Sequence, residues 1–185
     1  MELRHGFGGP GRQRGVTLIE QIMVIAVITV LAGIAVPPLF HLLQQNEIRV
    51  AQAEFIDALQ YTRALAAQNG VRTLFCPSTD GAHCSDGVRW DQGWLASRDH
   101  DHDNQPDDGP DRSGQGHRQV TIIGTEGRHQ VRFQADGSAG GNNITLTFCR
   151  HGQTEQALSV FVSRSGRVRG APADADHASA CAHAT

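Results

Sequence analysis

The chain has 185 residues, of which 39% are hydrophobic and 19% are charged, and its formal net charge is −3. This length fits one domain, or one domain with a membrane anchor. The composition excludes a polytopic membrane protein, a collagen-like fibre and a chain that is disordered throughout. All 16 basic residues are Arg, whose planar fork of donors suits phosphate. Because the net charge is negative, any anion site must come from a local patch.

Residues 1–15 form a Gly-rich segment with three Arg and one acid, which is typical of a leader removed during processing. Residues 16–36 then form an apolar run whose only charged residue is Glu20. At about 1.5 Å per residue this run spans roughly 30 Å, the thickness of the hydrocarbon layer of a membrane. The basic residues before the run predict that the N-terminus stays cytoplasmic and that the rest of the chain is exported.

Three kinds of segment fit residues 16–36. The first is a secretory signal that is cleaved after a small-residue triplet such as Gly33–Ala35, and the second is a plain single-span anchor. The third is a membrane segment in which Glu20 has a function. A carboxylate in this position costs about 2.5–3.5 kcal/mol on insertion scales. Neither a secretory signal nor a plain anchor has a use for it.

A basic leader, Gly15, Glu20 and an apolar helix follow one another in this order. The order resembles the type III signal of type IV pilins and of type II secretion pseudopilins. The resemblance implies that a prepilin peptidase cleaves between Gly15 and Val16 and that the new amino group of Val16 is methylated. It also implies that Glu20 neutralises the N-terminal amine of a neighbouring subunit, which agrees with the need of a buried charge for a partner. Pro37 and Pro38 are expected to kink or loosen the helix.

The segment 37–70 is expected to continue the chain into the globular domain. Within it, Leu39–Asn69 is expected to form an amphipathic helix. Its apolar stripe recurs at spacings of three and four residues and comprises Ile48, Ala51, Phe55, Ile56, Leu59, Thr62, Leu65 and Ala66. Asn69 and Gly70 predict the end of the helix.

Residues 71–185 are expected to form a β domain in the periplasm, because Gly-rich turns separate short alternating or β-branched segments. The segments are 71–76, 87–96, 119–123, 130–134, 144–149 and 157–163. They suffice for one antiparallel sheet or a small β-sandwich, and with the helix they predict an α+β pilin fold. They leave too little chain for a large enzyme cleft, and no catalytic motif occurs in the sequence, so the chain is not predicted to be an enzyme.

Four cysteines, Cys76, Cys84, Cys149 and Cys181, lie in this exported part of the chain. Their even number predicts disulfides, and three pairings are possible. We favour Cys76–Cys84, which closes a short loop, and Cys149–Cys181, which ties the C-terminal tail to a strand. Because no CxxC pair is present, a zinc site is disfavoured.

The chain from Val71 onward resembles the FimT/GspH group of minor pilins and pseudopilins. The resemblance is carried by the order of several short pieces: Phe75-Cys76-Pro77, Trp90 to Trp94, the Asp-rich stretch after them, Phe133 to Gly137, Leu146 to Cys149, and Ser165 to Arg169. Ser97 and Arg98 depart from it, since an apolar strand is expected to continue there.

Charge is divided unevenly along this domain. From Thr79 to Asp111 there are nine Asp and two Arg, whereas residues 117–171 carry seven Arg and three acids. Arg164, Arg167 and Arg169 cluster at the end of the last predicted strand and in the turn after it. In an extended segment, residues two apart share one face and lie about 6.5–7 Å from each other, which is close to the phosphate spacing of a nucleic-acid strand. Gly166 and Gly170 would let the backbone approach a ligand closely.

In the FimT branch a Gly-Arg-x-Arg element is associated with DNA binding during natural transformation. The resemblance carries this role to Gly166, Arg167 and Arg169, with Arg164 as a helper. Because no aromatic residue lies between the arginines, binding would be to the DNA backbone, independent of base sequence and weakened by salt. The alternative is a solvated strand end that is rich in Arg because the chain contains no Lys.

Residues 99–108 carry carboxylates at alternate positions, as does the first half of a calcium-binding EF-hand loop. The Gly expected at the sixth position is Asn104, and the Glu expected at the twelfth is Pro110. The interleaved His residues suit a transition metal better than calcium. We therefore predict a solvated acidic loop, with no metal site and no cofactor.

These observations predict a minor pilin in the inner membrane, with its C-terminal domain in the periplasm, that is built into a type IV pilus near the tip. The predicted partners are major and minor pilin subunits, the prepilin peptidase, inner-membrane lipid before assembly, and DNA. One alternative is a structural pseudopilin of a type II secretion system that binds no DNA. Another is a pilus-priming minor pilin whose arginines contact protein carboxylates.

Overall fold

A computed structural model describes residues 15, 17–141 and 143–184, and for the helical residues 36–45 it describes the backbone alone. The predicted leader up to residue 14 and the predicted methylation site Val16 lie outside the described residues, as do the side chains of Pro37 and Pro38. The chain divides into two compact units, Met1–Leu42 and Leu43–Thr185, which are described separately.

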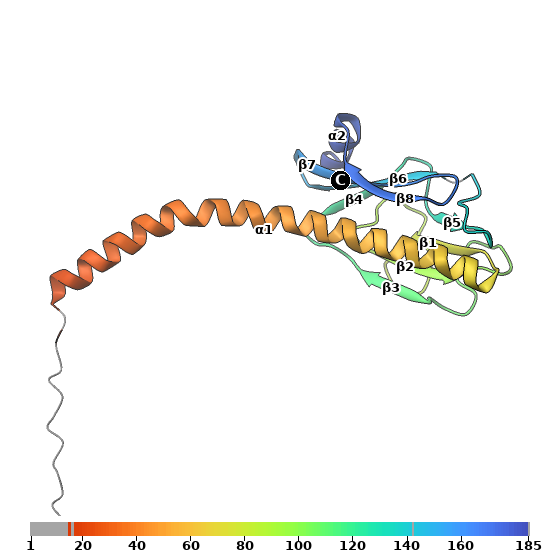
Figure 1. Ribbon diagram of the computed structural model, residues 1–185, viewed down its shortest axis with the longest axis horizontal. Helices are drawn as coiled ribbons and strands as arrows, with labels where there is room; N and C mark the ends of the chain where they lie inside the picture. The colour runs from red at the N-terminus through yellow and green to blue at the C-terminus, as the bar shows by residue number, and fades with distance from the viewer. Residues whose placement is uncertain (1–14, 16, 142, 185) are drawn as a thin grey trace, which may run out of the picture. The chain divides into compact units, whose positions relative to one another are not determined.

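The described part of the first unit is helical from Leu18 onward and belongs to α1 (Leu18–Asn69), which continues through both prolines (Figure 1). Its segment Leu18–Ala35 has a mean hydropathy of 2.3 and is long and apolar enough to cross a membrane. All its side chains are exposed within the chain itself, and this suits lipid or other subunits. The hydroxyl of Thr29 donates to the carbonyl of Ile25 at 2.7 Å, so this polar group needs no water.

The second unit contains the C-terminal part of α1, whose buried stripe agrees with the predicted amphipathic helix. The buried residues are Ile48, Ala51, Phe55, Ala58, Leu59, Thr62 and Ala66. The helix ends at Asn69, as predicted, and Gly70 follows with a φ of +65°. Such a left-handed residue is the usual reason for a glycine after a helix.

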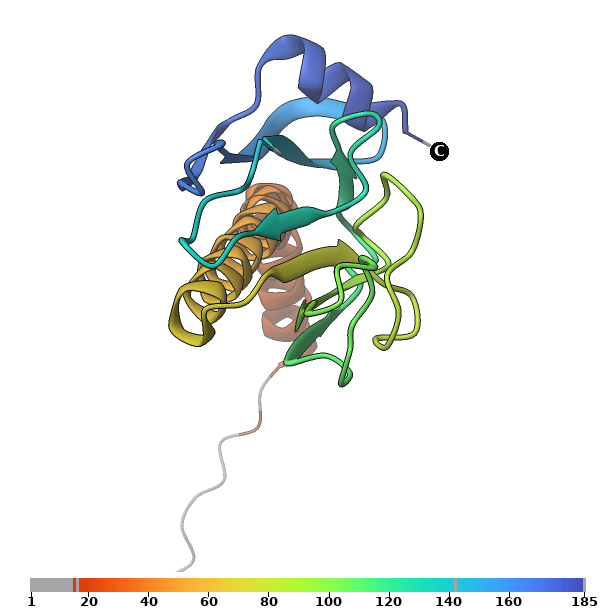
Figure 2. The same ribbon diagram turned by 90° about the vertical axis from the view of Figure 1, so that its right-hand side faces the viewer.

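Two antiparallel four-stranded sheets complete the second unit (Figures 1 and 2). Sheet A has the order β3 (Arg112–Gln115), β2 (Gly93–Arg98), β1 (Thr73–Pro77) and β5 (Val131–Phe133). Sheet B has the order β4 (Thr121–Gly124), β6 (Ile144–Arg150), β7 (Gln153–Val162) and β8 (Val168–Pro172). The predicted α+β fold is therefore confirmed, and the strands form two sheets, where the sequence left one sheet or a small β-sandwich open.

One aromatic ring joins the helix to both sheets. Phe55 of α1 makes edge contacts with Phe75 of β1 at 5.7 Å and with Phe148 of β6 at 5.2 Å between ring centroids. It also contacts Trp90 at 6.3 Å and Trp94 at 6.1 Å. Edge-to-face pairs contribute about 0.5–1.5 kcal/mol each beyond the burial of their area. This cluster therefore holds the strands of both sheets in place against α1.

A second helix, α2 (Ala175–Ala182), was not predicted and lies over sheet B on the side away from α1 (Figure 2). Asp174 caps it by accepting from the backbone N–H of His177. The disulfide Cys149–Cys181 attaches α2 to β6, and the disulfide Cys76–Cys84 closes the loop after β1. This is the pairing that the sequence favoured.

The strand predictions need corrections at three strands. β3 and β8 were not predicted, whereas the short strand expected within 87–96 is β2, which begins at Gly93 and is preceded by an isolated bridge between Arg89 and Ile123. β2 also continues through Ser97 and Arg98, where the sequence departs from the expected apolar pattern. Two contacts explain how it does so. The buried hydroxyl of Ser97 donates to the carbonyl of Gly109 at 2.8 Å, and Arg98 pairs with Asp111 at 3.2 Å.

Candidate functional site

The hairpin between β7 and β8 carries the three predicted arginines in what we call the arginine turn, residues 163–169. The turn is closed by the backbone N–H of Ser163, which donates to the carbonyl of Arg167 at 3.0 Å, and by that of Gly166, which donates to the carbonyl of Ser163 at 2.9 Å. The hydroxyl of Ser163 accepts from the N–H of Arg167 at 3.1 Å. Main-chain atoms and one serine therefore define the turn, and the guanidinium groups make no hydrogen bond to the described residues that shapes it.

Gly166 fixes the turn against the rest of the domain. Its φ is +76°, and a Cβ atom added there would lie 2.0 Å from the carbonyl oxygen of Gly137 in the loop between β5 and β6. The backbone N–H of Ala139 in that loop donates to the carbonyl of Arg164 at 3.0 Å. Arg63 of α1 donates to the same Gly137 oxygen at 2.9 Å. The arginine turn is thus anchored on a loop that α1 itself holds.

This geometry corrects the expected role of Gly166. It is buried against Gly137, so it permits close packing within the domain and offers no backbone surface to a ligand. Gly170 is exposed, although a Cβ atom added there would lie 2.9 Å from the side chain of Ile56. Arg164, Arg167 and Arg169 are exposed as well and can contact a ligand.

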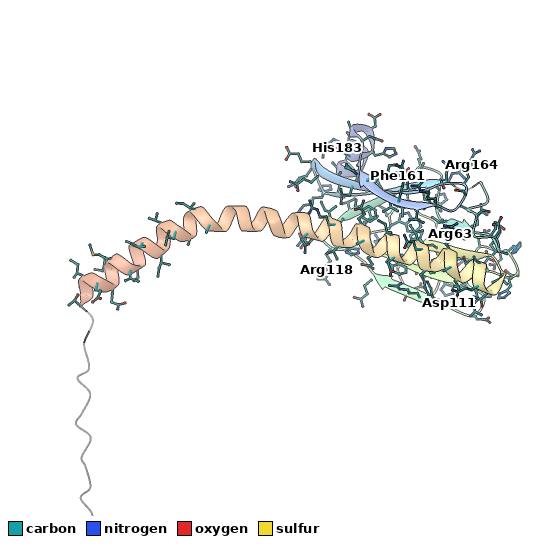
Figure 3. All side chains as sticks on the ribbon, in the orientation of Figure 1. Arg63, Asp111, Arg118, Phe161, Arg164 and His183 are labelled. Atoms are coloured by element: carbon teal, nitrogen blue, oxygen red, sulfur yellow. A yellow bond between two sulfur atoms is a disulfide. The ribbon has the colours of Figure 1, made fainter. Side chains whose placement is uncertain are left out.

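The three arginines line one groove of about 530 Å³ together with Asn143, Thr145 and Phe161. The guanidinium of Arg169 lies over the ring of Phe161, its register partner on β7, at 4.8 Å from the ring centroid. Figure 3 places Arg164 and Phe161 at the end of sheet B that lies away from His183 and the C-terminal helix. The sequence analysis did not identify Phe161 as part of the site. The pattern that could have indicated it is an aromatic residue between two valines of a strand whose side chains face the core.

The arginine turn carries positive charge that no neighbouring acid neutralises. Within the described part of the chain, Arg164, Arg167 and Arg169 form no ion pair, whereas arginines elsewhere do. The pairs are Arg72 with Asp99, Arg89 with Asp91, Arg98 with Asp111, Arg112 with Asp57 and Arg150 with Glu47. The partner carboxylates raise the pKa of Arg89 and of Arg98. Unpaired guanidinium groups on one exposed groove can hold a phosphate or a carboxylate of a partner.

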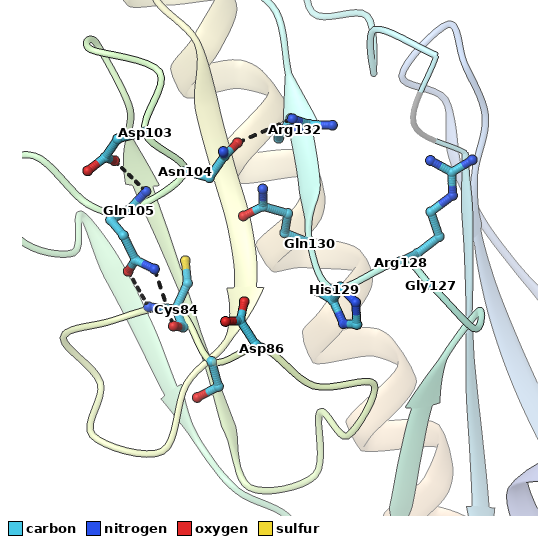
Figure 4. Close-up of a pocket in the computed structure, with 11 residues that line it drawn as sticks. Cys84, Asp86, Asp103, Asn104, Gln105, Gly127, Arg128, His129, Gln130 and Arg132 are labelled. Atoms are coloured by element: carbon cyan, nitrogen blue, oxygen red, sulfur yellow. Dashed lines mark hydrogen bonds between the residues drawn. The ribbon is translucent and has the colours of Figure 1, made fainter.

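The acidic loop between β2 and β3 is less solvated than predicted. Asp99 is fully buried and pairs with Arg72 of the segment before β1. Beside this loop lies a polar groove of about 410 Å³, lined among others by Asp86, Asp103 and Arg132 (Figure 4). The groove brings acidic and basic side chains together, so it offers no single sign of charge to a ligand.

Of the predicted processing residues, the structure describes Gly15 and Glu20. Both are exposed, and Glu20 lies in the first turn of α1. Among the residues that the structure describes, Glu20 forms no ion pair.

Two family models match the sequence. The model for the type II transport protein GspH matches residues 51–166, and the model for the prokaryotic N-terminal methylation motif matches residues 10–36. No curated protein matches the sequence.

Solved structures of pilins resemble the fold. The type IV minor pilin FimU of Pseudomonas aeruginosa, in space group P21, has a TM-score of 0.57 and 22% identity, over 69% of this chain and 90% of that one. A second crystal form of FimU has a TM-score of 0.52 and 20% identity, over 67% of this chain and 92% of that one. The minor pseudopilin EpsH from the type 2 secretion system of Vibrio cholerae has a TM-score of 0.50 and 13% identity, over 68% of this chain and 97% of that one.

Proposed function

Because this chain belongs to the GspH family of type II transport proteins and carries the N-terminal methylation motif, it is a minor pilin or pseudopilin, and we propose that it is a type IV pilus subunit that binds DNA through the arginine turn. The observation that carries the proposal is the groove where Arg164, Arg167 and Arg169 lie exposed and form no ion pair with any residue that the structure describes. The resemblance of the Gly166 to Arg169 element to the FimT branch supports DNA as the ligand and natural transformation as the process.

Processing at the membrane comes first in this proposal. The prepilin peptidase cleaves between Gly15 and Val16, and the new amino group of Val16 is methylated. In the assembled filament Glu20 pairs with the N-terminal amine of a neighbouring subunit. The methylation motif and the apolar segment Leu18–Ala35 support this sequence of events and anchoring in the inner membrane. The two disulfides suit an oxidising compartment, so we place the second unit in the periplasm before the subunit enters the pilus near its tip.

Binding to DNA would depend on the phosphates and not on the bases. Phe161, the only ring among the described residues that line the groove, already lies under Arg169 at 4.8 Å, so it leaves no open platform on which a base could stack. Guanidinium groups that contact phosphates displace counterions, so affinity falls steeply as salt rises. The acidic residues around sheet A repel DNA and would restrict it to the face that carries the arginine turn.

A structural pseudopilin of a type II secretion system is the second candidate function. The likeness of the fold to EpsH and the description of the matching family favour it. In that case the arginine turn would contact carboxylates of other minor subunits, as it would in a pilus-priming subunit. DNA binding is the property that separates these candidates.

The test is an electrophoretic mobility shift with duplex DNA and the full chain purified in detergent, at two salt concentrations. We expect retardation that weakens with salt and is strongly reduced in the double variant Arg167→Gln with Arg169→Gln. Loss of two phosphate contacts should reduce the slope of log affinity against log salt by about 1.8. The control is Arg49→Gln with Arg118→Gln, which removes the same charge from two other exposed arginines.

Two results would contradict DNA binding by the arginine turn. If the unmodified chain fails to retard DNA even at low salt, the secretion-type function replaces the proposal. If both double variants weaken binding equally, the interaction depends on overall charge and has no defined surface.

A further inference from the structure

The loop between β2 and β3 brings three carboxylates to one point. Asp99, Asp101 and Asp107 each place an oxygen atom within 4.8 Å of the others. Oxygen ligands lie 2.3–2.6 Å from a calcium ion, so two ligands of one ion lie at most about 5 Å apart. The three oxygens can therefore belong to one coordination sphere without rearrangement of the loop.

Asp99 supplies an independent observation that points to a cation. Its side chain is fully buried, and only one of its oxygens, Oδ2, accepts from Arg72. The other oxygen, Oδ1, is buried and has no hydrogen-bond donor among the described residues. A buried acceptor left unpaired costs about 1–3 kcal/mol, and more when it is charged. A cation held between Asp99 and its two neighbours would satisfy it.

The charge of the cluster also favours a cation. Arg72 offsets the charge of Asp99, whereas Asp101 and Asp107 add two negative charges beside it. The ring of His100 contacts Asp107 at 3.1 Å. The backbone N–H of His100 also donates to Asp107. Without a cation, the two carboxylates repel each other on a short loop.

The loop is held in place independently of any ion. Asn104 accepts hydrogen bonds from Arg72 at 3.3 Å and from Arg132 of β5 at 3.2 Å. Gln105 accepts from the backbone N–H of Cys84 at 2.8 Å and donates to its carbonyl at 3.4 Å (Figure 4). Asn104 also has a φ of +69°, so it takes the left-handed turn for which EF-hand loops use Gly at the corresponding position. The carboxylates are thus presented on a preformed frame.

We propose that Asp99, Asp101 and Asp107 form a calcium site that stabilises the loop between β2 and β3. The converging groups are all carboxylates, and His100 and His102 are not among them, so a hard cation is preferred to zinc. Calcium is preferred to magnesium because it accepts irregular geometry, with waters and backbone carbonyls completing its shell. The site is independent of the arginine turn and of DNA binding.

The experiment titrates calcium chloride into the full chain, purified in detergent and freed of metal with EDTA, in an isothermal titration calorimeter. We expect saturable binding of one ion per chain and a melting temperature that rises with calcium, because the ion binds the folded state. Zinc chloride and magnesium chloride are titrated in parallel and should bind more weakly.

The variants Asp101→Asn and Asp107→Asn test the ligands without disturbing the buried pair of Asp99 and Arg72. Each should weaken calcium binding by at least about tenfold, since affinity follows the number of charged ligands. The control Asp108→Asn removes the same charge from the next residue, which is not part of the cluster, and should leave the affinity unchanged.

Three outcomes would overturn the site. The first is an unmodified chain that shows no saturable calcium binding. The second is a control variant that weakens binding as much as Asp101→Asn, which would mean diffuse attraction to an acidic loop. The third is zinc binding that is tighter than calcium binding and unaffected by Asp101→Asn and Asp107→Asn.

Discussion

Gly166 shows how one residue without a side chain positions three that carry charge. Its φ is +76°, and the carbonyl oxygen of Gly137 occupies the place where a Cβ atom would stand. The positive φ disfavours residues other than glycine, and a Cβ atom would clash with that oxygen and push the turn away from its anchor. Arg164, Arg167 and Arg169 depend on this anchor for their common groove.

Gly166→Ala should therefore destabilise the domain by at least about 1–3 kcal/mol, since it adds a clash to a strained backbone. The control is Gly152→Ala in the turn between β6 and β7, where φ is +71° but no atom lies within 4 Å of the added Cβ. Urea unfolding of both variants separates the clash from the strain. Equal losses of stability would show that contact with Gly137 contributes nothing.

At the scale of elements, strands with an apolar period were predictable and those without one were not. β6 and β7 alternate between the core and the outer face, and both were found in the sequence. β3 is a polar segment with a glycine, where Gly114 leaves room for the ring of Trp94 at 2.3 Å from an ideal Cβ position. β8 has a glycine and a proline and forms only as the edge partner of β7. Tertiary pairing determines both strands, and a single sequence does not display it.

The helix α2 was missed for a related reason. Its eight residues are mostly small or polar and bury Ala178, Cys181 and Ala182. So few apolar side chains form no stripe, and the disulfide to Cys149 supplies much of the attachment. The candidate site was predicted in part: the arginines were identified by charge, whereas Phe161 and Arg63 join the site through register and packing.

Removing the Cys149–Cys181 disulfide by a double change to Ser should lower the stability by about 3.5–4 kcal/mol on the chain-entropy account. The same change at Cys76 and Cys84 should cost about 2.5 kcal/mol. The difference follows from sequence separations of 32 and 8 residues. Urea unfolding of the two double variants measures it, and a larger loss for the shorter loop would contradict the loop-closure explanation.

The cap of α2 makes part of the stability depend on pH. The backbone N–H and the ring of His177 lower the pKa of Asp174, so its contribution is present above the unfolded pKa near 4 and is lost as the pH falls through the folded value. Asp174→Asn keeps a capping oxygen but cannot titrate. We expect the difference in melting temperature between the two chains to shrink from pH 6 to pH 3. A constant difference would contradict this account.

At the scale of the whole molecule, the proposed assembly depends on the first unit. An exposed apolar helix with a charged residue in its first turn is unfavourable for an isolated subunit in lipid. The proposed pairing of Glu20 with another subunit's amine would resolve this, and the long apolar surface would then serve as an assembly surface. The N-terminal part was predictable because its signal is local and linear.

Glu20→Gln should leave the chain in the membrane and remove it from sheared filaments. Breaking a buried charge pair costs about 3–5 kcal/mol, so incorporation should fall by at least about a hundredfold. Glu47→Gln, beyond the apolar segment, is the matched control and should be incorporated normally. Immunoblots of membrane and filament fractions measure both, and normal incorporation of Glu20→Gln would contradict the proposed pairing.

The arginine turn is closed by main-chain atoms, Ser163 and Gly166, and among the described residues no guanidinium hydrogen bond takes part in closing it. Arg164 and Arg167 can therefore be exchanged without altering the scaffold that displays them, whereas Arg169 also packs on Phe161. If the proposed function holds, a filament built from such subunits could change what it captures while its architecture is inherited unaltered.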